Sequence, residues 1–271
     1  MAVKKWLLLS LCVWAFPVYG IRLIEKTGLA EFCQKAATHS AIFANFRSQP
    51  IFEASKETGQ QYLDFIVKNY PELLSHLELL RTSDTIGGPA IYKYGEWGSF
   101  SPMTLRYIKI AGDLLRQFGD LSQLHIVEVG AGYGGMCKVL ADVAGFASYT
   151  IVDIPQCTAI AKKYLSSLGV QNVTFLDDAE LTSPQTFDLL ISNYSFSEMS
   201  VRDQYRTLVC LIENAPRGYM LLNSLAPAAG IPCMQMNTLI SLLLQMGKVG
   251  TVESEKPLIH PSHLLLTWRS Q

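Results

Sequence analysis

The sequence predicts an α/β protein in which a mostly parallel sheet, with an antiparallel last strand, follows a helical region. From residue 125 onward, short apolar runs alternate with longer amphipathic runs, which is typical of a parallel sheet with helices on both faces. Near the C-terminus, the apolar runs 248–253 and 263–268 are joined by only nine residues. Because that connection is too short for a crossover helix, we expect these two strands to be antiparallel.

The composition is that of a folded globular protein. Its 271 residues are 49% hydrophobic and 17% charged, which allows one large α/β domain and a smaller helical part. The net charge is −1, and the chain has no basic stripe with interleaved aromatic residues. We therefore expect no nucleic-acid partner.

Residues 21–101 form the expected N-terminal helical region. Apolar residues recur at helical spacing over 30–46 and 62–67, and Pro71 begins a further helical turn. The segment 81–102 has no periodicity, so we expect a loop there. Its aromatic residues have two interpretations, a stacking wall for a sugar ring or anchors for a long loop. These residues are Tyr92, Tyr94, Trp97 and Phe100.

The next element is a helix expected over 103–118, which carries Arg106 and leads into the first strand of the sheet. Ser101 and Pro102 favour this start, because serine caps a helix and proline suits its first turn.

The run HIVEVGAGYGG, residues 125–135, predicts a buried strand, a glycine turn and a helix over 136–143. Glycine permits a sharp turn and a close approach of the backbone to a ligand. Glu128 stands two residues before the first glycine, where its carboxylate can reach a cationic or hydroxylated ligand group. The glycines at alternate positions are Gly130, Gly132 and Gly134.

This motif suits S-adenosyl-L-methionine, which has an ammonium group, a ribose and no phosphate. Gly130, Gly132 and Gly135 also fit the dinucleotide fingerprint, so NAD is the alternative cofactor.

The next two strands also end in carboxylates. The strand expected over 148–153 ends at Asp153, where an acid can hold both ribose hydroxyls of either cofactor. The strand over 172–178 ends at Asp177 and Asp178, and an acid there commonly meets the exocyclic amine of adenine. Three successive strands with terminal acids favour S-adenosyl-L-methionine over NAD.

The alternation continues to the C-terminus. A strand over 187–196 runs into a polar loop, a fifth strand is expected over 218–223, and a helix over 234–246. The six cysteines have no CxxC pair and no close Cys/His spacing, so we expect reduced core cysteines and no structural zinc site.

Residues 1–20 have features of a signal peptide. Lys4 and Lys5 precede an apolar run over 6–16, which is too short for a confident membrane span. A buried N-terminal helix is the alternative, and we expect no stable span elsewhere. Because S-adenosyl-L-methionine is made and kept in the cytoplasm, the localisation stays open.

Four segments of the chain carry a resemblance to a known family: SPMTLRYIKIAGDL, VEVGAGYGG, YTIVDIP and SNYSFSEM. Over roughly residues 85–268 the chain resembles bacterial sugar O-methyltransferases of the class I S-adenosylmethionine-dependent superfamily. The resemblance implies a Rossmann-like sheet closed by one reversed strand in a domain spanning 102–271. It also implies a small-molecule or glycan acceptor that is methylated on a hydroxyl group.

The resemblance further assigns roles to particular residues. It places Glu128 and the three glycines on the methionine side, Asp153 at the ribose, and Asp177 or Asp178 at the adenine. It places Asn193, with Ser192 and Tyr194, beside the sulfonium and the acceptor. The Pro-Pro-Tyr that follows this asparagine in amino-methylating enzymes is missing, which disfavours N-methylation.

Two residues are candidates for the base that deprotonates an acceptor hydroxyl. Glu198 follows the fourth strand at the carboxyl edge of the sheet, and His260 lies in the connection between the last two strands. A solvated acid near a helix start and a surface histidine are the structural alternatives. We assign no metal ligand, although Asp177, Asp178 and Asn193 together with Glu198 also fit a divalent-cation site. An NAD-dependent oxidoreductase and a non-catalytic binding module are the competing functions.

Overall fold

The computed structural model describes residues 27–271. The strands of its main sheet are β3 (His125–Val129), β4 (Ser148–Asp153), β5 (Val173–Asp177), β6 (Leu189–Asn193), β7 (Arg217–Leu222), β8 (Lys248–Ser254) and β9 (Leu264–Ser270). The helices are α3 (Leu29–Thr38), α4 (Ser40–Phe43), α5 (Lys56–Asn69), α6 (Leu77–Leu80), α7 (Pro102–Phe118), α8 (Gly135–Val143), α9 (Pro155–Ser167), α10 (Ser195–Glu198), α11 (Val201–Cys210), α12 (Leu225–Ala228) and α13 (Met236–Gln245). A small second sheet contains β1 (Tyr92–Lys93) and β2 (Ser99–Phe100).

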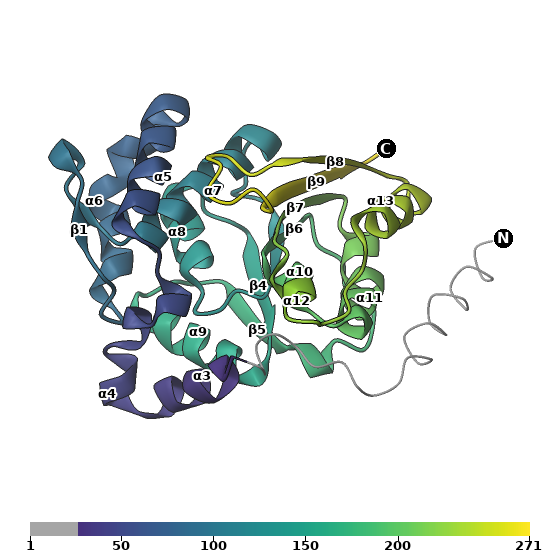
Figure 1. Ribbon diagram of the computed structural model, residues 1–271, viewed down its shortest axis with the longest axis horizontal. Helices are drawn as coiled ribbons and strands as arrows, with labels where there is room; N and C mark the ends of the chain where they lie inside the picture. Colours follow the sequence, from purple (N-terminus) through teal and green to yellow (C-terminus); the bar gives the residue numbers. More distant parts are fainter. Residues whose placement is uncertain (1–26) are drawn as a thin grey trace.

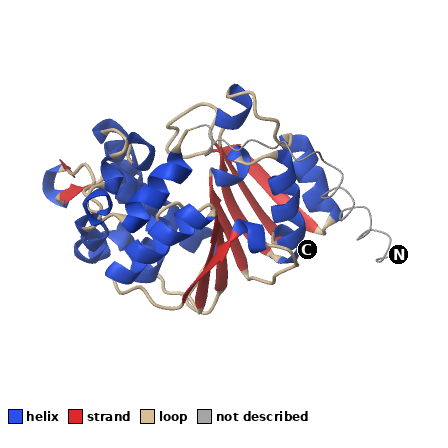
Figure 2. Ribbon diagram, turned by 90° about the horizontal axis from the view of Figure 1, so that it is seen from below, coloured by secondary structure: helices blue, strands red, loops and turns tan. Residues whose placement is uncertain are grey.

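The main sheet has the strand order β5-β4-β3-β6-β7-β9-β8, and helices cover both of its faces (Figure 1, Figure 2). β9 pairs antiparallel with β7 and β8, whereas every other pair of neighbours is parallel. The α/β class, the mostly parallel sheet and the antiparallel last strand are therefore confirmed. Because β9 runs against the others, the loop from β8 to β9 (residues 255–263) lies at the carboxyl edge of the parallel strands.

Strand β3 separates two apolar layers, because successive side chains of a strand point to opposite faces. Ile126 belongs to the cluster that contains the buried residues of α7, α8 and α9, and Val127 belongs to the cluster with α11 and α13. Glu128 alternates with Val127 and therefore shares the face of Ile126. This alternation buries a carboxylate at the carboxyl end of the central strand, where it is 1% exposed.

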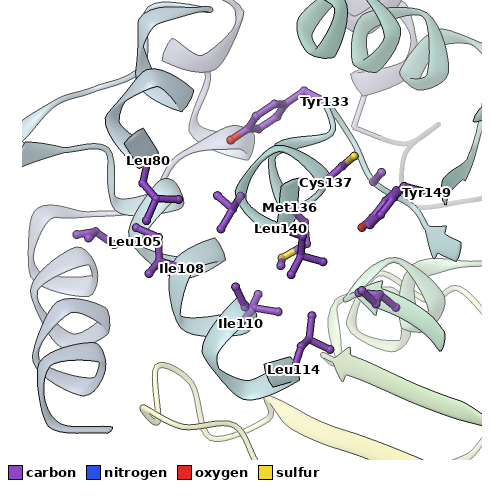
Figure 3. Close-up of a cluster of buried hydrophobic side chains, with 14 of the residues drawn as sticks. Leu80, Leu105, Ile108, Ile110, Leu114, Tyr133, Met136, Cys137, Leu140 and Tyr149 are labelled. Carbon is purple, nitrogen blue, oxygen red and sulfur yellow. The ribbon is translucent and has the colours of Figure 1, made fainter. Parts of the chain in front are cut away.

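Helix α7 starts as the sequence predicts. The hydroxyl oxygen of Ser101 accepts a hydrogen bond from the Thr104 N–H at 3.1 Å, and Pro102 stands at the first position of the helix. Buried side chains of α7, among them Ile110 and Leu114, lie beside those of α8 (Figure 3). This packing fixes α7 against the layer that covers the sheet.

The N-terminal helical region packs on the same layer, with α3 against α9 and α5 against α7 (Figure 1). The helical spacing over 30–46 corresponds to two helices, because His39 adopts an extended conformation between α3 and α4. One apolar cluster continues from this region into the sheet.

The boundary at residue 101 stays a prediction, and the signal-like segment 1–20 lies outside the described residues. Over residues 27–271, no helix has the length and apolar character needed to cross a membrane.

The aromatic segment 81–102 is folded rather than irregular, because it contains the hairpin of β1 and β2. Tyr94 and Phe100 are buried, and the hydroxyl group of Tyr94 donates to the carbonyl oxygen of Lys56 at 3.4 Å. A cavity lies at the carboxyl ends of the parallel strands, and none of these four aromatic residues lines it. They anchor the hairpin on the helical region, which favours the second of the two interpretations.

Candidate active site

A cavity of about 490 Å³ opens at the carboxyl ends of β3, β4, β6 and β7. This edge is where open parallel α/β sheets bind their ligands, and the volume lies within the usual range for small-molecule sites. The cavity collects most of the residues proposed from the sequence. Those in its lining are Glu128, Gly130, Gly132, Asp153, Asp178, Asn193 and Glu198.

Glu128 is held by the strands on both sides of β3. The hydroxyl group of Tyr149 on β4 donates to its Oε2 at 2.8 Å, and the side-chain amide of Asn193 on β6 donates to its Oε1 at 3.2 Å. Burial raises the pKa of Glu128 to about 7, although these two hydrogen bonds act in the opposite direction. A cationic ligand group beside this carboxylate would favour its ionised form.

The glycine turn after β3 is tied to the end of β4. Asp153 Oδ2 accepts the N–H of Gly132 at 2.9 Å, and its Oδ1 accepts the N–H of Ile154 at 2.8 Å. A Cβ on Gly132 would meet only the Phe52 ring within 4 Å, at 3.9 Å, so the backbone here faces open cavity. Asp153 therefore shapes the turn and lines the site at once.

Two of the predicted ligand residues lie outside the cavity lining. Gly134 precedes α8 with φ +86°, and a Cβ there would stand 2.9 Å from Leu165 Cδ1, so the lack of a side chain lets α9 pack closely against this turn. Asp177 accepts the hydroxyl hydrogen of Thr158 at 2.7 Å. Of the two adjacent acids, Asp178 is the one in the lining.

Asp178 belongs to a small charged group at the edge of the cavity. Its Oδ2 lies 3.3 Å from Arg206 Nη2, which also contacts Asp203 Oδ1 at 2.8 Å. All three side chains line the cavity, next to apolar Leu181. This edge of the cavity therefore combines a carboxylate that is paired with an arginine and an apolar side chain.

Arg106 was not assigned a role from the sequence, yet it lines the cavity from α7. Its Nε and Nη2 are buried without a hydrogen-bond partner among the described residues, and its Nη1 donates only to the Met103 sulfur at 3.5 Å. The guanidinium carbon lies 4.3 Å from the centre of the Tyr194 ring. Asn193 Oδ1 is likewise buried without a partner within residues 27–271. Unsatisfied buried groups of this kind are expected where a ligand supplies the partner.

The two predicted bases differ in position. Glu198 lines the cavity, and its Oε1 accepts the Asn223 side-chain amide at 2.6 Å. Burial raises its pKa. His260 is exposed and absent from the lining, because its ring folds back on the 255–263 loop, where Nδ1 lies 2.8 Å from Ser262 Oγ. The histidine of that loop which does line the cavity is His263.

Residues 27–271 hold no group of three or more His, Cys, Asp or Glu side chains placed to bind a metal ion. Each cysteine of that range is a free thiol, and four of them are buried: Cys33, Cys137, Cys157 and Cys210. The lining of the cavity contains carboxylates, amides, two arginines, one histidine, hydroxyl groups and apolar side chains.

No protein-family model and no curated protein matches the sequence. Among solved structures, an S-adenosylmethionine-dependent methyltransferase from Mesorhizobium loti is 18% identical, with a TM-score of 0.45 over 58% of this chain and 95% of that chain. Magnesium protoporphyrin IX methyltransferase from Synechocystis PCC 6803, solved with bound SAH, is 14% identical, with a TM-score of 0.46 over 76% and 97%. An rRNA methylase from Streptococcus thermophilus is 15% identical, with a TM-score of 0.43 over 61% and 96%.

The strand order and the reversed β9 give this chain the Rossmann-like fold predicted from the sequence. Identities and TM-scores this low say nothing of a ligand. The ligand is therefore inferred from the side chains that line the cavity of this chain.

Proposed function

We propose that the protein is an S-adenosyl-L-methionine-dependent methyltransferase. The observation that carries this proposal is that one cavity is lined both by a buried carboxylate, Glu128, and by the guanidinium of Arg106, which has two nitrogens without a hydrogen-bond partner among the described residues. Arg106 is close enough to lower the pKa of Glu128, although the two form no ion pair. Such a pair suits the amino-acid end of the methyl donor, because Glu128 can accept from its ammonium group and Arg106 can donate to its carboxylate.

The remaining lining fits the other parts of the same molecule. Asp153 lines the cavity at the end of β4 and suits the ribose hydroxyls, and Asp178 beside Leu181 suits the adenine amine and ring. NAD would instead place a pyrophosphate among these carboxylates, where like charges repel. When bound, the methyl donor supplies an electrophilic carbon for attack by an acceptor.

The protein's own contribution to the reaction is to orient the acceptor and to manage its proton. Glu198 lines the cavity and is held by Asn223, and we propose that it accepts a hydrogen bond from an acceptor hydroxyl. We propose a hydroxyl of a sugar or glycan as this acceptor, on the basis of the sequence resemblance and of this polar pair. The absence of a nucleic-acid partner stays a prediction.

Calorimetric titration with S-adenosylhomocysteine and, separately, with NAD tests the proposal. We expect saturable binding of S-adenosylhomocysteine and none of NAD. In Glu128→Gln, S-adenosylhomocysteine affinity is expected to fall about 10- to 100-fold, because a charged hydrogen bond contributes about 1.5–3 kcal/mol. Asp188→Asn, which changes an acid outside the cavity lining, is the matched control and should retain wild-type affinity. Binding of NAD alone, or of neither ligand, would contradict the proposal.

A further inference from the structure

We propose that His263 is the general base that removes the acceptor's hydroxyl proton and that Glu255 is its positioning residue. This inference rests on the proposed methyltransferase function. It replaces His260, the histidine expected from the sequence, by a histidine three residues further along the same loop.

Three side chains meet in a closed set of short contacts. The Tyr194 hydroxyl group donates to Glu255 Oε2 at 2.5 Å, and His263 Nδ1 lies 2.9 Å from the same oxygen. His263 Nδ1 also lies 3.0 Å from the Tyr194 hydroxyl oxygen. Glu255 is fully buried, whereas the His263 side chain is 20% exposed. The carboxylate is therefore shielded from solvent, and the imidazole lines the cavity.

These contacts fix which ring nitrogen carries the proton. An ionised carboxylate only accepts hydrogen bonds, and the single proton of Tyr194 is already directed at Glu255. A lone pair on His263 Nδ1 would repel the carboxylate at 2.9 Å, so Nδ1 must donate. In the neutral ring, the lone pair is then on Nε2, for which there is no hydrogen-bond partner among the described residues. Nε2 is the atom free to accept a proton.

The charge around this group keeps Glu255 ionised. Burial acts to raise its pKa, but the hydrogen bond from His263, the charge of Arg106 and the hydrogen bond from Tyr194 outweigh burial and lower it. The charge of Lys109 on α7 acts in the same direction. An ionised Glu255 both orients the imidazole and stabilises its protonated form after proton transfer.

The backbone at Tyr194 supports a functional origin for this cluster. Tyr194 follows β6 directly and has φ +70°, a conformation that is uncommon for a residue with a large side chain. The centre of its ring lies 4.7 Å from the centre of the His263 ring. The same ring centre lies 4.3 Å from the Arg106 guanidinium carbon. One strained residue thus joins the proposed base to the residue proposed to hold the methyl donor's carboxylate.

Two other side chains near the cavity, Tyr194 and Glu198, are less suited to act as the base. Burial raises the pKa of Tyr194 well above its ordinary value, so the phenol stays protonated. Glu198 has one oxygen bound to Asn223, which suits it to anchor the hydroxyl. Acting as base, His263 Nε2 takes the hydroxyl proton while the acceptor oxygen bonds to the methyl carbon. The carbon–sulfur bond breaks, and its electron pair stays on sulfur, so the step needs no further reactant.

The first test is the tautomer of the neutral imidazole, read from long-range ¹H–¹⁵N correlation spectra of the protein with S-adenosylhomocysteine present. We expect His263 to carry its proton on Nδ1. His260 provides an internal comparison, because its Nδ1 accepts the N–H of Ser262 at 3.2 Å and its proton should therefore be on Nε2. Glu255→Ala should shift His263 toward the Nε2–H form, and Glu255→Gln should retain more of the Nδ1–H form. A proton on Nε2 of neutral His263 in the wild-type protein would overturn the proposal.

The second test is methyl transfer from radiolabelled donor to whichever monosaccharide or glycan a screen identifies. His263→Ala is expected to lose about 100- to 10,000-fold in kcat, with S-adenosylhomocysteine affinity unchanged and partial rescue by added imidazole. His260→Ala should retain its activity. Undiminished turnover in His263→Ala contradicts this inference alone, whereas loss of S-adenosylhomocysteine binding by the wild-type protein contradicts the proposed function.

Discussion

The hydroxyl group of Tyr149 donates to Glu128 Oε2 at 2.8 Å, from the strand beside the one that carries the carboxylate. The pairing register places Tyr149 opposite Ile126, two residues before Glu128 on the same face of the sheet. Asn193 holds the other carboxylate oxygen from the opposite side. The carboxylate is therefore fixed in position before any ligand arrives, and its protonation should control binding.

Binding of S-adenosylhomocysteine should strengthen as the pH rises from 5.5 to 8. Burial raises the pKa of Glu128 to about 7, and the ligand's ammonium group requires the ionised form. Below that pKa, affinity should fall by about tenfold per pH unit, because one proton must be released on binding. Tyr149→Phe removes a hydrogen bond that lowers this pKa. In that variant, the midpoint of the pH dependence of binding should therefore move to higher pH. Titration calorimetry across this range measures both midpoints, and a pH-independent affinity would contradict the role of Glu128.

Arg106→Met should weaken binding of the amino-acid end of the methyl donor and leave binding of its adenosine end unchanged. If Arg106 holds the carboxylate, the variant should bind S-adenosylhomocysteine about 10- to 100-fold more weakly, the effect of losing a charged hydrogen bond. Its affinity for methylthioadenosine, which lacks the amino-acid end, should change little. Arg202→Met removes an arginine outside the cavity lining and is the control. An equal loss for both ligands would show that Arg106 does not act on the carboxylate.

The site and the sheet were predictable from the sequence to different degrees. Glu128, Gly132 and Asp153 could be placed at the cavity because each follows or ends an apolar run, and strand ends converge on one edge. Arg106 was not assigned a role because its unsatisfied guanidinium nitrogens are a feature of the packing, which no sequence pattern records. His263 was placed at the start of the last strand, but β9 begins at Leu264. Because of this shift of one residue, the sequence pattern did not place His263 in the loop that reaches the cavity.

Short irregular elements were the other source of error. The apolar spacing over 30–46 indicates one helix, but local backbone geometry at His39 divides it. The segment 81–102 lacks periodicity because its two strands contain only two residues each. Such elements are stabilised by tertiary contacts, such as the burial of Tyr94 and Phe100, which a sequence pattern does not record.

Two glycines of the same motif should respond differently to substitution. Gly134→Ala places a Cβ 2.9 Å from Leu165 Cδ1 at φ +86°, so it should destabilise the fold by about 1–3 kcal/mol. Gly132→Ala has space for its Cβ within the protein, but that Cβ enters the cavity. Both variants have the strain of an alanine at positive φ. Gly132→Ala should nevertheless weaken S-adenosylhomocysteine binding more than Gly134→Ala does. Urea unfolding and calorimetry on both variants measure the two effects, and equal ligand affinities would contradict the assignment.

Arg47 should contribute more to stability than any surface charge. It is fully buried in the helical region, where its Nη2 contacts Asp84 Oδ1 at 3.0 Å and Glu53 Oε1 at 3.3 Å. The same nitrogen donates to the hydroxyl oxygen of Ser101, the cap of α7, at 2.7 Å. Arg47→Met leaves two buried carboxylates without their cation, and loss of one partner of a buried ion pair costs about 3–5 kcal/mol.

Urea unfolding of Arg47→Met should therefore show a fall of that size in the free energy of unfolding, whereas Lys93→Met at an exposed position should change it by less than about 0.5 kcal/mol. Adding Glu53→Gln and Asp84→Asn to Arg47→Met should recover part of the loss, because the stranded charges are removed. Since Ser101 caps the helix that carries Arg106, the single variant should also weaken S-adenosylhomocysteine binding. A stable single variant with wild-type affinity would show that the helical region does not hold α7 in place.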